Sequence, residues 1–241
     1  MSGRTIRVVG VGMGPQHVTP EAAAALRSSS YVVAARKGPD DALLEVRREV
    51  CAQHGLEVVE VEDPARDRDD PADYAGAVRD WHAARAEAWG AEITRRTGDP
   101  AFLVWGDPSL YDSTIRVVDT VAAQIGAQVE VVAGIAAPQL LAARHGIVLH
   151  PIGAPVHVTT QRRQAEAIAS GQRNLVVMLT SRVDLEGLED WSLWWGANLG
   201  TPSERLVAGR VREVAEEVEA AREAARSEAG WVMDLYLLRH G

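Results

Sequence analysis

The chain has 241 residues, 46% of them hydrophobic, and a formal net charge of −9. This composition excludes a disordered chain and provides for one large or two small domains. The negative charge argues against broad nucleic-acid binding, which requires a basic face.

One cysteine, Cys51, excludes an internal disulfide and fits a reducing compartment. No Cys/His cluster has the spacing of metal ligands, so no metal site is predicted. The chain begins without a signal-peptide pattern, and no apolar run approaches the length that crosses a membrane. We therefore expect a soluble, cytoplasmic protein with no membrane or nucleic-acid partner.

A glycine loop over residues 10–15 (GVGMGP) follows a predicted first strand, and Thr19 is placed to cap the next helix. The loop is superficially similar to a dinucleotide-binding fingerprint, but Pro15 stands where the third glycine is required. The next predicted strand, 31–35, ends in Arg36 and Lys37 instead of a ribose-binding acid. The pattern therefore argues against NAD as the ligand.

Arg36 and Lys37 close the second predicted strand at its carboxyl end. Two adjacent cations there could bind a carboxylate or a phosphate, and solvated loop charge is the alternative. Further along, apolar and aromatic residues from Tyr74 to Ile93 repeat at helical spacing. Trp81 and Trp89 in this stripe are expected in the core or at a subunit contact.

The sequence over residues 104–114 (VWGDPSLYDST) predicts a strand, a tight turn and a helix start. Ligands of open α/β sheets bind just outside the carboxyl ends of strands. The turn offers one carboxylate and several hydroxyls there, from Asp107, Tyr111, Ser113 and Thr114. The alternative is an ordinary turn with helix-capping side chains.

A fifth strand over 128–132 ends in small residues, which allow a ligand to approach the backbone. Five strands alternating with helices predict a mostly parallel sheet. Two prolines and a glycine over 150–155 predict the domain boundary, with an N-terminal α/β domain at 1–150 and a C-terminal α/β domain at 151–241. In the second domain we expect strands, a loop over 199–204 and an amphipathic helix over 212–226.

Four separated pieces occur in the order found in the tetrapyrrole (precorrin) methylases, and the chain resembles this family over nearly its whole length. The pieces are 9–12 with the helix start at Thr19, 106–108, 132–135 and 199–204. Three further pieces most resemble the deacetylating C1-methylases of aerobic cobalamin biosynthesis, and these are 37–38 followed by 43–50, then 105–114 and 195–201.

The resemblance implies an α/β fold of two domains with S-adenosylmethionine in the cleft between them, and a homodimer. It implies methylation of precorrin-5 at C1 with release of acetate. The candidate cofactor-binding residues are Met13, Gly106, Asp107, Pro108, Leu110, Ser113, Thr114, Ala136, Ala137, Met178, Leu179 and Gly200. The chain departs from the family pattern at 13–15, at Ala133, and over 180–190, which is too short for the usual helix.

Methyl transfer requires positioning more than a protein nucleophile, whereas loss of an acetyl group is helped by a base. Asp107, Tyr111 and Asp112 are the candidate catalytic residues, with His17 as a further candidate base. Substrate carboxylates require cations, which arginine binds as a bidentate fork. The candidate substrate-binding residues are Gly12, Arg36, Lys37, Arg116 and Arg162, with Arg163 beside the last.

Three alternatives remain open on the sequence. One is a different methyltransferase of the same fold, acting on another precorrin, on uroporphyrinogen, or on a protein or RNA. Another is a nucleotide-binding dehydrogenase, which only the glycine loop and Arg36 favour. The third is a non-catalytic tetrapyrrole carrier.

Overall fold

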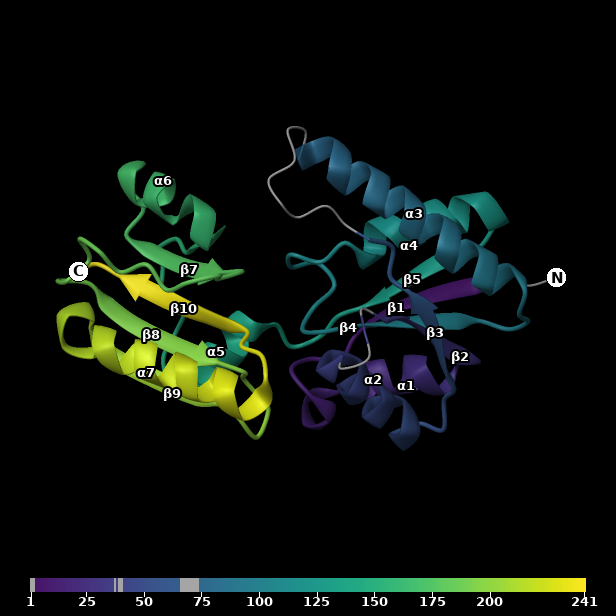
Figure 1. Cartoon of the computed structure of the whole chain (residues 1–241), viewed down its shortest axis with the longest axis horizontal. Coiled ribbons are helices and arrows are strands. Elements are labelled where there is room, and N and C mark those ends of the chain that lie inside the picture. The colour runs from purple at the N-terminus through teal and green to yellow at the C-terminus, as the bar shows by residue number, and fades with distance from the viewer. Residues whose placement is uncertain (1–2, 37, 39–40, 66–73) are drawn as a thin grey trace. The chain divides into compact units, whose positions relative to one another are not determined.

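Two five-stranded sheets, each with its own helices, make up the computed structural model (Figure 1). The structure describes residues 3–36, 38, 41–65 and 74–241. The chain divides into two units, Met1–Ala136 and Ala137–Gly241, and each is described by itself.

The sheet of the first unit is parallel throughout and has the order β3-β2-β4-β1-β5. Its strands are β1 (Thr5–Gly10), β2 (Tyr31–Arg36), β3 (Val58–Glu62), β4 (Pro100–Val104) and β5 (Gln128–Val132). The prediction of a mostly parallel sheet is confirmed, because parallel neighbours require the helical crossovers that the sequence pattern indicated.

Four helices cover this sheet, two on each face (Figure 1). They are α1 (Pro20–Arg27), α2 (Ala42–Gln53), α3 (Tyr74–Thr94) and α4 (Thr114–Ile125), with a short 3-10 turn, η1 (Pro15–His17), before α1. Thr19 accepts a hydrogen bond from Ala22 N at 3.1 Å, and Asp41 accepts one from Leu44 N at 3.1 Å. Thr19 thus caps α1 as predicted, and Asp41 caps α2 in the same way.

Consecutive residues of a strand point to opposite faces, and the core of the first unit divides accordingly. Val8 packs with Trp89 and Ile93 of α3, whereas Val9 packs with residues of α1 and α2. Trp89 is therefore a core residue. Trp81 is half-buried, donates from Nε1 to the carbonyl of Pro64, and lies beneath the Arg85 guanidinium.

The second unit has a mixed sheet of order β6-β7-β10-β8-β9, in which only β6 and β7 are parallel. Its strands are β6 (His157–Thr160), β7 (Asn174–Met178), β8 (Ser192–Ala197), β9 (Arg205–Arg210) and β10 (Asp234–Arg239). Its helices are α5 (Ala137–His145), α6 (Gln164–Ala169) and α7 (Val211–Ala229), with a 3-10 turn, η2 (Gln161–Arg163).

The strand β9 was not predicted from the sequence. It is an edge strand, and Val207 is its only residue in the buried class. A strand with one buried side chain has almost no alternating pattern, so pairing with β8 decides its conformation.

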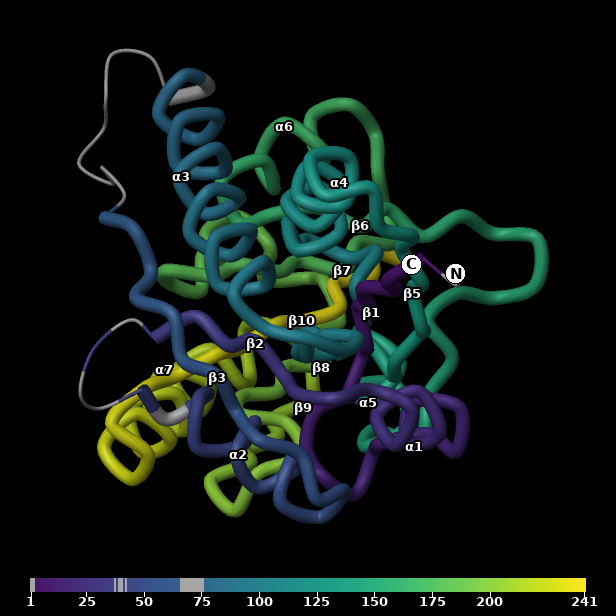
Figure 2. The backbone as a smooth tube through the Cα atoms, turned by 90° about the vertical axis from the view of Figure 1, so that its right-hand side faces the viewer, coloured from purple at the N-terminus to yellow at the C-terminus, as the bar shows by residue number. Residues whose placement is uncertain are grey.

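The division between the units falls before α5, whereas the sequence placed the boundary after residue 150. The reason is that α5 packs against β8, β9 and β10, and its Leu141 is fully buried. Residues 146–156 then form a long loop between α5 and β6, which extends outward in Figure 2. Ile152 in this loop is fully exposed.

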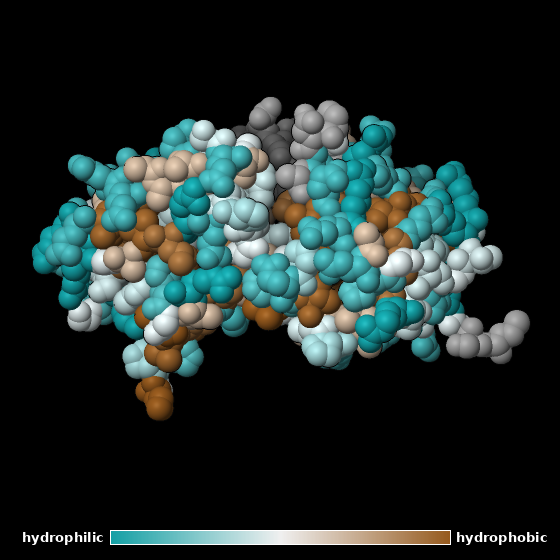
Figure 3. All heavy atoms as spheres, turned by 90° about the horizontal axis from the view of Figure 1, so that it is seen from below, coloured by the Kyte–Doolittle hydropathy of each residue, from teal (hydrophilic) through white to brown (hydrophobic). Residues whose placement is uncertain are grey.

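Hydrophilic side chains cover most of the face drawn in Figure 3, with apolar groups at the surface in patches. Within the described part of the chain, no helix has both the length and the hydropathy required to span a bilayer.

Leu141→Ala tests the placement of α5 in the second unit. We expect the free energy of unfolding to fall by about 2–5 kcal/mol, because a fully buried leucine is removed. Hydrogen exchange should rise in the amides of β8 and β10 and stay unchanged in β1 and β4. Leu206→Ala, at a side chain 37% exposed on β9, is the control and should cost much less. Faster exchange in β1 and β4 instead would contradict the assignment.

Candidate functional site

The carboxyl end of β4 lies at the point where the sheet reverses its winding. β4 lies between β2 and β1 in the sheet. The helix that follows β4 covers one face, while the helices that follow β1 and β2 cover the other. Ligands of open α/β sheets bind at such a reversal, just beyond the strand ends. The turn over 104–114 is therefore at the expected position.

Four glycines bring the ends of β1, β4 and β5 and the loops after them into main-chain contact. Gly106 N donates to Gly12 O at 2.7 Å, and Gly12 N donates to Gly106 O at 3.2 Å. A Cβ on Gly134 would lie 2.1 Å from Gly106 O, and one on Gly10 would lie 2.6 Å from Gly134 N. No side chain fits at either position, so the three strand ends form one platform made of backbone.

Asp107 fastens this platform. Its Oδ2 accepts a hydrogen bond from Gly134 N at 2.8 Å, and its Oδ1 accepts one from Ser109 N at 2.9 Å and another from Ser109 Oγ. Burial opposes ionisation of the carboxyl, but these hydrogen bonds outweigh it and lower the pKa of Asp107 below its ordinary value of 3.8. The ionised side chain thus joins the turn after β4 to the end of β5.

The rest of the turn presents side chains to solvent. Tyr111 has a left-handed backbone, with φ of 51°, and its side chain is exposed. Asp112 is exposed, and its Oδ1 accepts a hydrogen bond from Thr114 N at 2.6 Å, which caps the start of α4. Ser113 and Leu110 are half-buried, and Pro108 is buried.

Several predicted cofactor residues of the first unit do lie together. Met13 is buried, and its sulfur is 3.8 Å from the position of a Cβ on Gly106. Ala136 is also buried, with its Cα 3.7 Å from that position. Gly106 itself is left-handed, with φ of 74°, and a Cβ there would be in ordinary van der Waals contact with Met13, Ala136 and Ile135. Ala137 begins α5, where the first N–H groups have no helical partner.

In the second unit, Leu179 directly follows β7 and has an unusual backbone conformation. Its φ is 54°, and its side chain is 62% exposed although it is large and apolar. Strained backbone of this kind persists only where the surroundings impose it, and it is concentrated at functional sites. Met178, the last residue of β7, is half-buried beside it.

A buried carboxylate, Asp234, holds the chain just after Leu179. Thr180 Oγ1 donates to Asp234 O at 3.0 Å and also to Oδ1 of the same residue. Asp234 Oδ2 accepts hydrogen bonds from Trp195 Nε1 at 3.0 Å and from Arg222 Nε at 2.9 Å. The loop after β7 is thereby fixed to β8, β10 and α7.

Gly200 lies in a loop organised by a buried asparagine. Asn198 has φ of 48°, its Nδ2 donates to Ser203 Oγ at 3.0 Å, and its Oδ1 accepts from Met233 N at 2.9 Å. Gly200 N donates to Glu204 Oε2 at 2.6 Å. The sequence analysis missed both Asn198 and Asp234. A signal existed for Asn198, because asparagine is the residue other than glycine that most readily adopts a left-handed backbone.

The predicted cations are only partly placed. Arg36 is exposed at the end of β2, 3.9 Å from Glu60, and Arg116 is exposed on the first turn of α4. Lys37 lies outside the described residues. Arg162 belongs to η2 in the second unit, and its neighbour Arg163 pairs with Glu166.

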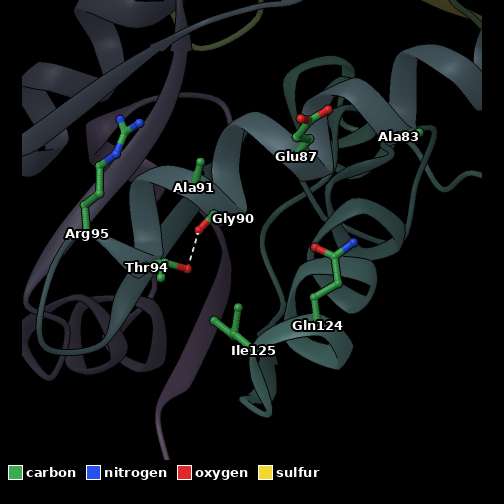
Figure 4. Close-up of a pocket in the computed structure, with 8 residues that line it drawn as sticks. All are labelled: Ala83, Glu87, Gly90, Ala91, Thr94, Arg95, Gln124 and Ile125. Carbon is green, nitrogen blue, oxygen red and sulfur yellow. Dashed lines mark hydrogen bonds between the residues drawn. The ribbon is translucent and has the colours of Figure 1, made fainter.

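Two surface hollows lie apart from these loops. A groove of about 650 Å³ between α3 and α4 is lined by Ala83, Glu87, Gly90, Ala91, Thr94, Arg95, Gln124 and Ile125 (Figure 4). Its residues near Thr94 and Gln124 precede β4 and β5, so it lies toward the amino ends of these strands, opposite Gly106. The other hollow borders residues 183–189 and α7. Neither contains a predicted site residue.

Metal or thiol chemistry has no support in the described residues. They contain no group of three or more His, Cys, Asp or Glu side chains that could hold a metal ion. Cys51 is buried, and burial raises the pKa of its thiol to about 11, so it is a poor nucleophile at neutral pH.

Asp107→Asn should reduce the dependence of the free energy of unfolding on pH at acidic pH. The pKa of Asp107 is lowered in the folded chain, so its ionised form stabilises the fold above the unfolded-state pKa. That stabilisation is lost as pH falls through the folded-state pKa, within the range below about pH 5. The measurement is the free energy of unfolding from pH 6 to pH 2.5. Asp119→Asn, on the exposed side of α4, should keep the wild-type slope. An unchanged slope in Asp107→Asn would contradict the assigned role.

Asp234→Asn should destabilise the second unit strongly, because it leaves Arg222 as an unpaired, largely buried charge. Asp234 is 0% exposed and Arg222 15% exposed, so the expected loss is about 3–5 kcal/mol in urea unfolding. Asp190→Asn removes a surface partner of Arg212 and should cost about 0–1 kcal/mol. Equal losses in the two variants would show that the buried pair is not an anchor.

Comparisons with known proteins identify the family to which this fold belongs. The family model of the tetrapyrrole (corrin/porphyrin) methylases matches residues 5–215. The chain is 40% identical over 251 aligned positions to a precorrin-6A synthase [deacetylating] from Sinorhizobium sp, covering 99% of this chain and 96% of that protein.

Solved structures give the same result. A cobalamin synthesis related protein (CobF) from Corynebacterium diphtheriae is 39% identical, with a TM-score of 0.85 and 99% of both chains covered. A uroporphyrin-III C-methyltransferase from Thermus thermophilus, solved with S-adenosylhomocysteine, shares the fold at 21% identity and a TM-score of 0.62, over 98% of this chain and 92% of that one. The predicted family is thereby confirmed, and this chain belongs to the tetrapyrrole (corrin/porphyrin) methylases.

Proposed function

We propose that this chain is the methyltransferase that converts precorrin-5 to precorrin-6A, with methylation at C1 and release of acetate. The observation that carries the proposal is the 40% identity, over 99% of the chain, to a precorrin-6A synthase [deacetylating]. Similarity of this extent over the full length favours this reaction over those of more distant methylases, which share the fold at 13–21% identity.

The strand-end platform fits a cofactor that is held by backbone and apolar groups. When bound, S-adenosylmethionine supplies the methyl group as an electrophilic sulfonium. Gly106 has no side chain and lies against Met13 and Ala136, and the buried Nε1 of Trp105 has no hydrogen-bond partner in the described structure. An exposed, strained Leu179 likewise fits an apolar ligand. The residues that would hold the cofactor are Met13, Gly106, Pro108, Leu110, Ser113, Thr114, Ala136, Ala137, Met178, Leu179 and Gly200.

The geometry favours different roles for Asp107 and Asp112, the two acidic side chains of the turn. Both oxygens of Asp107 accept hydrogen bonds, and its lowered pKa makes it a weak base. We therefore assign Asp107 to positioning the platform. Asp112 is exposed on the same loop and is the better candidate to activate water for deacetylation, with the Tyr111 hydroxyl beside it in the sequence.

Cations near the platform would bind carboxylates of the tetrapyrrole. Arg116 lies in the first turn of α4, and Arg36 ends the strand next to β4. Lys37 and Arg162 complete the proposed set, and Gly12 contributes backbone at the platform. Each buried, charge-assisted contact of this type is worth about 1.5–3 kcal/mol, and an exposed one much less.

The dehydrogenase alternative finds no support in the first glycine loop. Gly10 and Gly12 are packed against the neighbouring loops, and η1 separates them from the start of α1. The pyrophosphate of a dinucleotide requires these glycines directly at a helix N-terminus.

The proposal also includes a homodimer and a cytoplasmic location. Light scattering on the purified chain would measure the mass of the homodimer.

Incubation with S-adenosylmethionine and precorrin-5 should give a product that has gained one methyl group and lost its acetyl group, together with free acetate. Calorimetry should detect binding of S-adenosylhomocysteine and none of NADH or NADPH. The controls are precorrin-4 and uroporphyrinogen III, which should not be methylated. Tight NADPH binding without S-adenosylhomocysteine binding, or methylation of a control substrate alone, would overturn the proposal.

A further inference from the structure

An arginine that belongs to none of the predicted sets, Arg47 of α2, lies at the carboxyl end of the first sheet. Its Nε donates to Leu103 O at 3.2 Å, and its Nη1 donates to Leu43 O at 3.2 Å. Both acceptors are neutral carbonyls. Among the described residues, no carboxylate lies within ion-pair distance of the guanidinium.

The surroundings of Arg47 are unusual for a charged group. Burial lowers the pKa of its guanidinium, an effect that Asp41 and Asp112 oppose at longer range and Arg85 reinforces. Holding an ionised group away from water without an opposite charge is costly. The other well-buried arginine of this unit, Arg85, illustrates the usual arrangement, with a bidentate ion pair to Asp63 at 2.6 and 2.8 Å.

The position of Arg47 follows from a gap in the sheet. The register of β2 and β4 covers only Tyr31 with Pro100 and Val32 with Ala101. Beyond that point Leu103 O has no β2 partner, and Arg47 reaches it from α2, which packs on β2 and η1. The guanidinium is therefore placed where β2 and β4 separate, near the start of the turn over 104–114.

We propose that Arg47 binds a carboxylate of the tetrapyrrole substrate, an inference that rests on the proposed function. Arginine has five N–H donors, and the two carbonyls use two of them, so a bidentate contact remains available. Substrate is favoured over cofactor because of the strand order. Arg47 and Arg36 lie on the β2 side of β4, whereas the glycine platform lies on its β1 and β5 side.

The test compares Arg47→Gln and Arg47→Lys with wild type in turnover of precorrin-5. We expect KM for precorrin-5 to rise about 10- to 100-fold in Arg47→Gln, as for loss of a charge-assisted contact, with kcat within about threefold. Arg47→Lys should recover part of the loss, because it restores the charge without the fork. The Kd of S-adenosylhomocysteine should not change. Arg48→Gln is the matched control on the same helix, since Arg48 pairs with Glu45 and Glu60 at the surface.

Other outcomes separate the possible errors. A weaker Kd for S-adenosylhomocysteine with unchanged KM for precorrin-5 would assign Arg47 to the cofactor's carboxylate and overturn the proposal. Unchanged KM with a lowered thermal midpoint would make Arg47 a structural cap of Leu103. If wild type does not turn over precorrin-5, the proposed function fails by itself. Binding of uroporphyrin III, a polycarboxylate probe, then tests Arg47 independently, and equal affinities in wild type and Arg47→Gln would overturn it.

Discussion

The hydrogen bond from Gly134 N to Asp107 Oδ2 is the contact on which the candidate site of the first unit depends. It joins the ends of β4 and β5, and the paired hydrogen bonds of Gly12 and Gly106 add the end of β1. The close approach of these loops requires glycine at positions 10 and 134, where a Cβ would overlap backbone atoms of the neighbouring loop. A carboxylate bound to several N–H and O–H donors stays ionised at neutral pH, so these hydrogen bonds to Asp107 are retained under the conditions in which the platform would bind a ligand.

In the second unit another aspartate, Asp234, restrains the loop at a strand end. Asp234 is buried, and it fixes the chain after β7 through Thr180, Trp195 and Arg222. This anchoring accounts for the left-handed backbone of Leu179, which would relax in a free loop. In both units a carboxylate restrains the loop at a strand end, and the residues it restrains are small, apolar or main-chain groups. Such surfaces suit a reaction in which the protein contributes orientation and exclusion of water.

In the first sheet, Arg36 and Arg47 and the glycine platform lie on different sides of β4. On the β1 and β5 side of β4, residues 11–15 and 133–136 are small or apolar, and glycines there bring the backbones together. On the β2 side are Arg36 and Arg47, and Arg116 follows the turn itself. A surface of main-chain groups beside several arginines fits a ligand held by the backbone next to a polycarboxylate. The overall charge of −9 does not by itself exclude binding of an acidic ligand, because individual arginines can pair with its carboxylates.

The strands and helices of the first unit could be predicted from the sequence, because alternating and helical apolar spacing, the cap at Thr19 and the Gly-Asp-Pro turn are local signals. The family could also be predicted from four motifs that occur in the expected order. Only the tertiary structure decided that β9 is a strand, that α5 packs on the second sheet, and that Asp107 and Asp234 act as anchors. Each of these depends on partners far apart in the chain, such as Gly134 for Asp107 or Leu103 for Arg47. A pattern of neighbouring residues carries no information about which distant carbonyl or amide a side chain will meet.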